Sequence, residues 1–291
     1  MRQSVKTNVG IQPREVGRIF SGFLGTTHDP IGVRLVRGLA ERYADLVYGS
    51  ALGRGRAALG LPRARGVMSQ LMGPGTIAAT DPALTVLPDG ARLVATQTGY
   101  PVLVEADELS DELRRFLSAG PPPIYAGFGS MPVANRERLS KILVEAAERA
   151  GQRLVISRGW AGIAAVGHED ACLFVDEVPH SLLFPEVSAV IHHGGAGTVA
   201  TAARAGVPQI VLPAAADQFL WRGQVARLGL GPRAPMLRFV SAASLAKAIT
   251  AAVNDQTYRR RAQEVAGRLR AAPDGVATTV AEITRLASAA G

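Results

Sequence analysis

The sequence predicts an α/β protein whose better-defined part is a doubly wound parallel sheet. From about residue 120 onward, short β-rich runs alternate with stretches of helical character. The strand-like runs are apolar throughout rather than alternating, which is typical of parallel strands buried on both faces. Repetition of strand, helix and strand predicts right-handed crossovers that place helices on both faces of one sheet.

The predicted strands follow from these apolar runs. They are IYAGFGS (124–130), RLVIS (153–157), CLFVDEV (172–178), AVIHH (189–193) and QIVLP (209–213). Residues 133–150, between the first two runs, are predicted to form a helix that ends before Gly151. Its apolar stripe consists of Leu139, Ile142, Leu143, Ala146 and Ala150.

The C-terminal part is predicted to be helical. Ser241 is expected to cap a helix that runs to about Val253. A second helix is expected over residues 255–271, and a third from about Val276 to Ala289, after the Pro-Asp-Gly break at 273–275.

Residues 1–118 show a weaker pattern. Residues 31–60 are predicted to be helical and arginine-rich, and residues 84–104 to hold one or two short strands. Three consecutive prolines at 121–123 favour a stiff, extended linker, so we place a domain boundary there. The expected domains are a partial N-terminal α/β domain over residues 1–120 and a complete one over residues 121–291.

Composition indicates a globular protein, with 47% hydrophobic and 19% charged residues. No apolar run approaches the ~20 residues that span a bilayer, and no signal-peptide type stretch opens the chain. We therefore expect a cytoplasmic protein. The single cysteine, Cys172, lies in an apolar run, so neither an intrachain disulfide nor a thiolate metal cluster is expected.

The formal net charge of +8 would suit an anionic partner. The arginines are nevertheless spread widely, and no aromatic residues interleave with them as a nucleic-acid platform requires. We expect no nucleic-acid partner. A solvated basic surface is the default interpretation, with peripheral contact to the inner membrane surface as the alternative.

The run IHHGGAGTVATAARAG (191–206) predicts a strand, a tight glycine loop and a helix. The first amides of a helix have no internal acceptor and the helix dipole is positive there, so this arrangement suits a phosphate. His192 or His193, at the carboxyl end of the strand, adds a side-chain donor on the same side. A second strand ends in a glycine-rich turn in YAGFGSMP (125–132), where Ser130 can offer a hydroxyl. Two such loops at the carboxyl edge of one sheet favour a nucleotide ligand.

These residues resemble a known family. The run VPHSLLFPEVSAVIHHGGAGTVATAARAGVPQIVLPAAADQFLWRGQVARLGLGP (178–232) resembles the nucleotide-sugar signature of GT-B glycosyltransferases, in the bacterial branch related to antibiotic, glycolipid and sterol glycosyltransferases. TGYPVL (98–103) and SRGW (157–160) also resemble segments of that family. The resemblance covers roughly residues 50–290 and begins partway through the family's N-terminal domain, so the chain is expected to be N-terminally incomplete.

The resemblance implies a role for each donor-site position. His192 and the backbone of Gly195, Ala196, Gly197 and Thr198 would hold the diphosphate, with Ser130 contacting a phosphate from the facing loop. The backbone of Val178 would contact the nucleobase, and His180 would lie near the ribose. Asp217 and Gln218 would bind hydroxyls of the sugar, which suits a carboxylate beside an amide. Trp160 either packs beside the nucleotide or belongs to the core.

The implied reaction is an inverting transfer of a hexose from a UDP- or dTDP-sugar co-substrate to a hydroxyl of a lipid or secondary metabolite. The chain contains no Asp-x-Asp motif, so neither a metal nor a further cofactor is expected. Preorganised donors would stabilise the departing diphosphate instead.

No catalytic residue can be assigned from the sequence. The family's base is an N-terminal histidine supported by an aspartate, whereas His28 and Asp29 are adjacent, which rarely suits a base and its orienting partner. Three hypotheses stay open: an active hexosyltransferase, a donor-binding half that needs a partner subunit, and a truncated, non-catalytic remnant. A dehydrogenase is disfavoured because GFGSMP lacks the third glycine, and an epimerase of GT-B shape has no support from the long motif.

Overall fold

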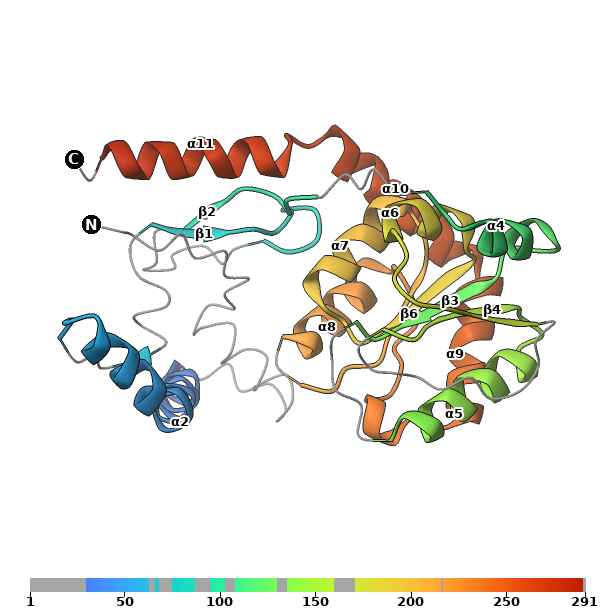
Figure 1. Cartoon of the computed structure of the whole chain (residues 1–291), viewed down its shortest axis with the longest axis horizontal. Helices are drawn as coiled ribbons and strands as arrows, with labels where there is room; N and C mark the ends of the chain where they lie inside the picture. The colour runs from blue at the N-terminus through green and yellow to red at the C-terminus, as the bar shows by residue number, and fades with distance from the viewer. Residues whose placement is uncertain are drawn as a thin grey trace. The chain divides into compact units, whose positions relative to one another are not determined.

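The computed structural model describes residues 30–62, 66–67, 75–86, 95–102, 108–129, 135–159, 171–215 and 217–289. The chain divides into two compact units, one comprising Met1–Pro101 with Pro273–Gly291 and the other Val102–Ala272 (Figure 1). This division does not coincide with the boundary expected at residue 120. The second unit includes the proline run, and the last helix of the chain belongs to the first unit.

The described part of the second unit contains a five-stranded parallel sheet in the order β5-β4-β3-β6-β7. The strands are β3 (Ile124–Gly127), β4 (Leu154–Ser157), β5 (Cys172–Val175), β6 (Ala189–His192) and β7 (Gln209–Val211). All five predicted strands are thus confirmed, and so is the doubly wound α/β class. The structure shortens each predicted run because turns take over where glycine, proline or polar residues begin.

The strand order reverses between β3 and β6, where Gly127 is paired with His192. Chain segments leave these neighbouring strands toward opposite faces of the sheet, and at such a reversal point an open α/β sheet is expected to hold its ligand crevice, at the carboxyl edge. Both glycine-rich loops singled out in the sequence follow these strands, so they lie at the reversal point.

Helices cover both faces of the sheet (Figure 1). On one face, α5 (Arg136–Arg149) and α9 (Ala242–Asn254) pack over Ile124, Ile156 and Ile191. On the other, α4 (Asp111–Ser118), α6 (His180–Leu183) and α7 (Ala196–Ala205) contribute to a core with Tyr125, Val155 and Val190. The alternation of Ile124 and Tyr125 between faces explains why the strands are apolar throughout.

The remaining elements of the second unit are α8 (Gln218–Leu228), α10 (Gln256–Ala271) and the 3-10 turns η1 (Phe184–Glu186) and η2 (Leu237–Phe239). The predicted cap of α9 is confirmed: Ser241 Oγ accepts from the Ser244 N–H at 3.2 Å, and Ser244 Oγ accepts from the Ser241 N–H at 3.0 Å. The buried stripe of α5 also matches the prediction, except that Ala150 lies just beyond the helix as its C-cap.

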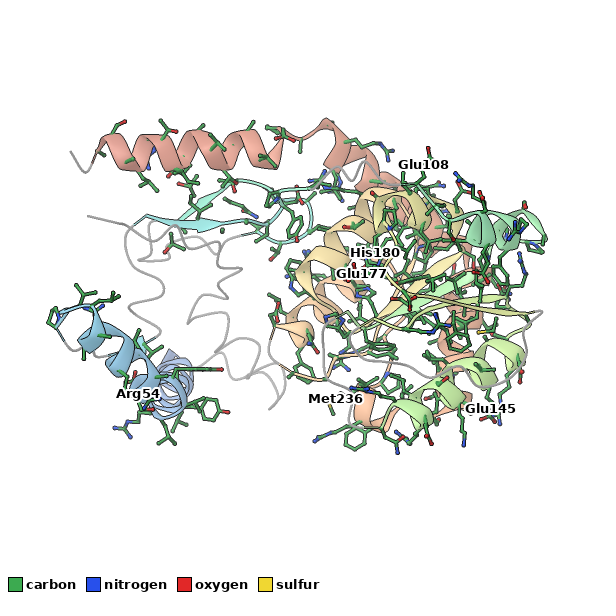
Figure 2. The ribbon with its side chains drawn as sticks, in the orientation of Figure 1. Arg54, Glu108, Glu145, Glu177, His180 and Met236 are labelled. Carbon is green, nitrogen blue, oxygen red and sulfur yellow. The ribbon has the colours of Figure 1, made fainter. Side chains whose placement is uncertain are left out.

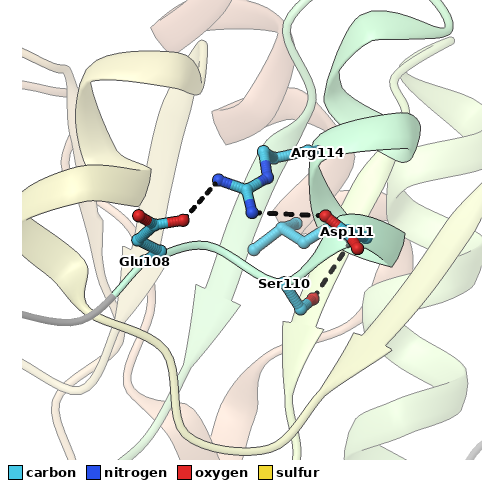
Figure 3. A network of polar contacts seen from close by, with 5 residues as sticks. Glu108, Ser110, Asp111 and Arg114 are labelled. Carbon is cyan, nitrogen blue, oxygen red and sulfur yellow. Dashed lines mark hydrogen bonds and ion pairs between the residues drawn. The ribbon is translucent and has the colours of Figure 1, made fainter.

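Helix α4 was not expected from the sequence. Ser110 Oγ caps it by accepting from the Leu113 N–H at 3.3 Å, and Arg114 pairs with Glu108 and Asp111, each at 3.2 Å (Figure 3). The proline run then leads directly into β3, where the Pro123 carbonyl accepts from the Ser188 N–H at 2.8 Å. The prolines therefore lie inside one unit rather than between two.

The first unit contains α2 (Pro30–Ala58), the parallel strands β1 (Thr76–Ala78) and β2 (Ala95–Gln97), and α11 (Gly275–Ser288). The hydroxyl of Thr279 on α11 donates to Thr98 at 2.9 Å, just beyond β2. The predicted helix over 31–60 and a strand within 84–104 are confirmed, whereas β1 was not predicted. Within the described residues, no helix is both long and apolar enough to cross a membrane.

Candidate functional site

The loop between β6 and α7 is shaped by two glycines. Gly194 has a φ of 96°, and a Cβ there would lie 2.8 Å from Val211 Cγ1 and 3.2 Å from the Gln218 carbonyl oxygen. Gly195 is the N-cap of α7 and forms no side-chain cap. The first residues of α7, Ala196, Gly197 and Thr198, therefore begin the helix at the carboxyl edge of the sheet without a side-chain acceptor at its cap.

His192 is fully buried at the end of β6. Its Nδ1 accepts from the Gly194 N–H at 3.1 Å, and its Nε2 lies 3.1 Å from Gln209 Oε1. Burial lowers the pKa of His192 to about 3, so the ring is neutral at physiological pH. Both ring nitrogens of His192 are therefore engaged within the protein, and the phosphate contact that the resemblance implies for His192 stays a prediction that would require one of these bonds to break.

His193, the next residue, lies between the loops that follow β3 and β6. Its imidazole lies so close to Gly195 that a Cβ there would be 2.7 Å from His193 Nε2, and a Cβ on Gly129 would be 3.6 Å from His193 Cε1. Nδ1 of His193 is buried and has no hydrogen-bond partner among the described residues. Burial lowers the pKa of His193, while the nearby Asp217 carboxylate opposes that shift.

The loops after β3 and β4 close the opposite side of the crevice. A Cβ on Gly159 would lie 3.1 Å from the Gly129 carbonyl oxygen, so these two loops touch through their glycines. Both residues have positive φ, 56° for Gly129 and 46° for Gly159. Glycine is thus needed where the backbones of the two loops approach each other. Ser130 and Trp160, which follow directly in the sequence, lie outside the described residues.

The N-cap and the first residue of α8, Asp217 and Gln218, are the two polar residues expected to bind the sugar. Asp217 Oδ2 accepts from the Trp221 indole N–H at 3.2 Å. Gln218 Oε1 accepts from the N–H groups of Ala214 and Ala215, at 2.8 and 3.1 Å. The carboxylate is therefore oriented by the indole, and the amide oxygen holds the loop that precedes α8.

His180 starts α6, above β3 (Figure 2). Its Nε2 lies 2.8 Å from Tyr125 Oη, and its ring stacks on Phe184 with centroids 4.6 Å apart. Burial lowers the pKa of His180 to about 4 and raises that of Tyr125 to about 12. Both groups are neutral at physiological pH, and one imidazole nitrogen is already used. Val178, two residues earlier, is half-buried.

The structure thus brings the loops after β3, β6 and β7 to His193, with Gly129 and Gly195 next to its ring and Asp217 close enough to influence its pKa. Ala196, Gly197 and Thr198 open α7 and Gln218 opens α8, and their contact with a ligand stays a prediction. The residues alone left His192 and His193 open as the donor at the end of this strand, the resemblance selected His192, and Gln209 was missed. The alternation of side chains along the strand distinguishes the two histidines, because His192 shares a face with the buried Val190, whereas His193 lies past the strand end.

The sequence of this chain is similar to a known protein family and to several known proteins. Residues 161–284 match the family described as "Erythromycin biosynthesis protein CIII-like, C-terminal domain". A vancomycin aglycone glucosyltransferase of Amycolatopsis orientalis is 41% identical over 232 residues, which are 79% of this chain and 55% of that protein. This chain is a glycosyltransferase homologue.

Two further relatives define the extent of the similarity. The homologue is 38% identical over 170 residues to a sterol 3-beta-glucosyltransferase of Arabidopsis thaliana, covering 58% of this chain and 26% of that protein. The solved glycotransferase of kitacinnamycin has a TM-score of 0.63 at 19% identity, covering 92% of this chain and 72% of that one. These comparisons confirm the resemblance to the bacterial antibiotic branch and the GT-B type of fold. The chain spans about half the length of the first curated relatives it matches.

Proposed function

We propose that this chain binds a UDP- or dTDP-sugar at the carboxyl edge of the sheet, as the donor side of a hexosyltransferase. The observation that carries this proposal is His193, whose ring lies between two glycine loops, whose Nδ1 has no partner among the described residues, and which is close to the start of α7, where no side chain caps the helix. A half-buried imidazole and several free backbone donors form a complementary environment for a diphosphate.

The individual roles follow from the positions of the loops. The N–H groups at Ala196, Gly197 and Thr198 would bind phosphate oxygens, with His193 taking the role that the resemblance gave to His192. Asp217 and Gln218 would bind sugar hydroxyls. His180 would face the ribose and the backbone of Val178 the nucleobase, while Ser130 remains the expected contact from the facing loop.

The proposed reaction is an inverting displacement at the anomeric carbon. An acceptor hydroxyl oxygen forms the new glycosidic bond, the bond to the diphosphate oxygen breaks with its electron pair, and the acceptor proton passes to a base that is not among the assigned residues. Negative charge builds on the leaving nucleoside diphosphate, where α7 and His193 stabilise it without a metal. Preorganised donors at such a position contribute several kcal/mol of barrier lowering.

The acceptor class follows from the named activities of the relatives. One is named for transfer to an antibiotic aglycone and another for transfer to a sterol, so we propose a hydroxyl of a secondary metabolite or lipid as acceptor. A cytoplasmic location, with peripheral contact to the inner membrane, fits a lipid acceptor and the net charge of +8. A donor-binding half that requires a partner subunit, or a non-catalytic remnant, is the alternative.

Calorimetric titration with UDP, UDP-glucose and dTDP-glucose tests the donor site. We expect binding that His193→Ala weakens roughly tenfold, the loss of one charge-assisted hydrogen bond. Arg149→Ala on α5, an exposed residue paired with Glu145, is the matched control and should bind as the unmodified chain does. Absence of binding to all three compounds, or binding unaffected by His193→Ala, would overturn the assignment of the site.

A further inference from the structure

Four buried groups at the glycine loop form a continuous chain of three hydrogen bonds. The Gly194 N–H donates to His192 Nδ1 at 3.1 Å, and His192 Nε2 lies 3.1 Å from Gln209 Oε1. Gln209 Nε2 in turn donates to the Val199 carbonyl at 3.3 Å. His192 and Gln209 are both fully buried on strands that are otherwise apolar.

Only one arrangement of protons satisfies this chain. A backbone N–H can only donate, so Nδ1 of His192 must be the unprotonated nitrogen. The single proton of the neutral ring then lies on Nε2 and is donated to the amide oxygen of Gln209. That choice leaves the amide nitrogen facing the Val199 carbonyl, where it can donate. The amide orientation and the histidine tautomer therefore determine each other.

This chain of hydrogen bonds connects both ends of the loop between β6 and α7. Gly194 is inside the loop, while Val199 lies in the first turn of α7 and donates its own N–H to the Gly195 carbonyl at 3.0 Å. Neighbouring strands β6 and β7 supply the two side chains between these points. Buried polar side chains cost free energy unless they are hydrogen-bonded, so a pair of them here is explained by what they hold in place.

We propose that Gln209 is a positioning residue of the donor site, which fixes the tautomer of His192 so that His192 holds the glycine loop in its ligand-binding conformation. This inference rests on the proposed function. Gln209 touches neither phosphate nor sugar; it acts through His192 and Gly194 on the amides and on His193, which face the crevice.

Two substitutions separate this role from simple packing. Gln209→Met keeps the volume but removes the acceptor for His192 Nε2, which frees the ring to change tautomer and release the Gly194 N–H. In Gln209→Glu a carboxyl oxygen can still accept from Nε2, and a protonated carboxyl can also donate to the Val199 carbonyl. Ile210→Val, a buried neighbour on β7 that packs on the opposite face, is the matched control.

Nitrogen NMR of the histidine rings, without ligand, is the decisive measurement. The unmodified chain, Ile210→Val and Gln209→Glu should show His192 with an unprotonated Nδ1, and Gln209→Met should lose that signature together with the Gly194 amide shift. UDP titration should give a Kd about tenfold higher for Gln209→Met and nearly unchanged for Gln209→Glu. An unaltered His192 ring and Gly194 amide in Gln209→Met would overturn the proposal.

A second readout covers the case in which Gln209→Met does not fold. In Gln209→Glu the Nε2–H of His192 would donate to a carboxyl oxygen in place of an amide oxygen, which should shift the Nε2 resonance, and an unshifted resonance would show that the two side chains are not in contact. The ligand-free spectra also separate the two proposals. If the ring responds as expected but the unmodified chain binds no UDP, the link between Gln209 and the loop stands and the donor assignment fails.

Discussion

The adjacent histidines His192 and His193, at the end of β6, have different surroundings. His192 lies within the protein, neutral and hydrogen-bonded on both sides, whereas His193 lies between two glycine loops with a nitrogen unused among the described residues. The two residues are adjacent, and successive side chains along a strand point to opposite faces, so the two rings point in different directions. A single-residue insertion before His192 would shift both histidines by one position and leave no histidine at the buried position, so the spacing is as important as the identity of the residues.

Acid should destabilise the folded chain through its buried histidines. The pKa of His192 falls to about 3 and that of His180 to about 4, from an ordinary 6.5, because burial disfavours the charged ring. Below pH 6.5 the unfolded chain binds protons that the folded chain does not, so stability is present above that pH and declines as the pH falls toward 4 and then 3. Each histidine contributes a slope of up to about 1.4 kcal/mol per pH unit.

Urea unfolding between pH 7.5 and 5 measures this slope in a range where carboxylates contribute little. Replacement of one buried ring, in His180→Gln, should reduce the slope without removing it. A free energy of unfolding that is constant across this range would contradict the buried, neutral state of both rings.

Gly194 should tolerate no side chain. Alanine would have to adopt a φ of 96° with its Cβ 2.8 Å from Val211 Cγ1, so Gly194→Ala is expected to cost at least about 1–3 kcal/mol and to weaken UDP binding. Gly223→Ala, within α8 and with no atom within 4 Å of the added Cβ, should instead raise stability by about 0.5–1 kcal/mol. Denaturation curves of the two variants should therefore shift in opposite directions.

At the scale of elements, capping decides where the helices start. In α9 the two serines satisfy each other's backbone N–H groups, and no acidic residue in the first turn assists them. Ser241→Ala should therefore destabilise the second unit by about 1 kcal/mol. Ser118→Ala, which removes an exposed hydroxyl near the end of α4, should change stability far less. Equal effects of the two substitutions in chemical denaturation would argue against the cap as the cause.

The same elements show what sequence could and could not predict. The strands of the second unit were predictable because continuous burial leaves an apolar run, and α5 because its stripe has helical spacing. Helix α4 was missed although Ser110, followed by Asp111 and Glu112, is a usable start signal. Strand β1 has only three residues and no such signal. Gln209 was missed because its partner is set by the register between β6 and β7, which no local pattern encodes.

At the scale of the whole molecule, the two units should respond separately to substitution. A Cβ on Gly275 would lie 2.5 Å from the Tyr100 carbonyl oxygen, where the start of α11 packs against the segment after β2. Gly275→Ala should therefore loosen the first unit alone. Hydrogen exchange followed by mass spectrometry should show faster exchange in β1, β2 and α11, with unchanged protection in β3 and β6. Faster exchange throughout the sheet would indicate that the units unfold together.

The first unit is assembled from segments at both ends of the chain, and this affects its biosynthesis. Strands β1 and β2 leave the ribosome long before α11, whose Thr279 and Glu282 bond to Thr98 and Thr96. At roughly 5–20 residues per second, the early strands wait about 10 to 35 s while the entire second unit is translated. During that interval β1 and β2 lack their hydrogen-bond partners on α11, so the first unit cannot finish folding until its last helix has left the ribosome.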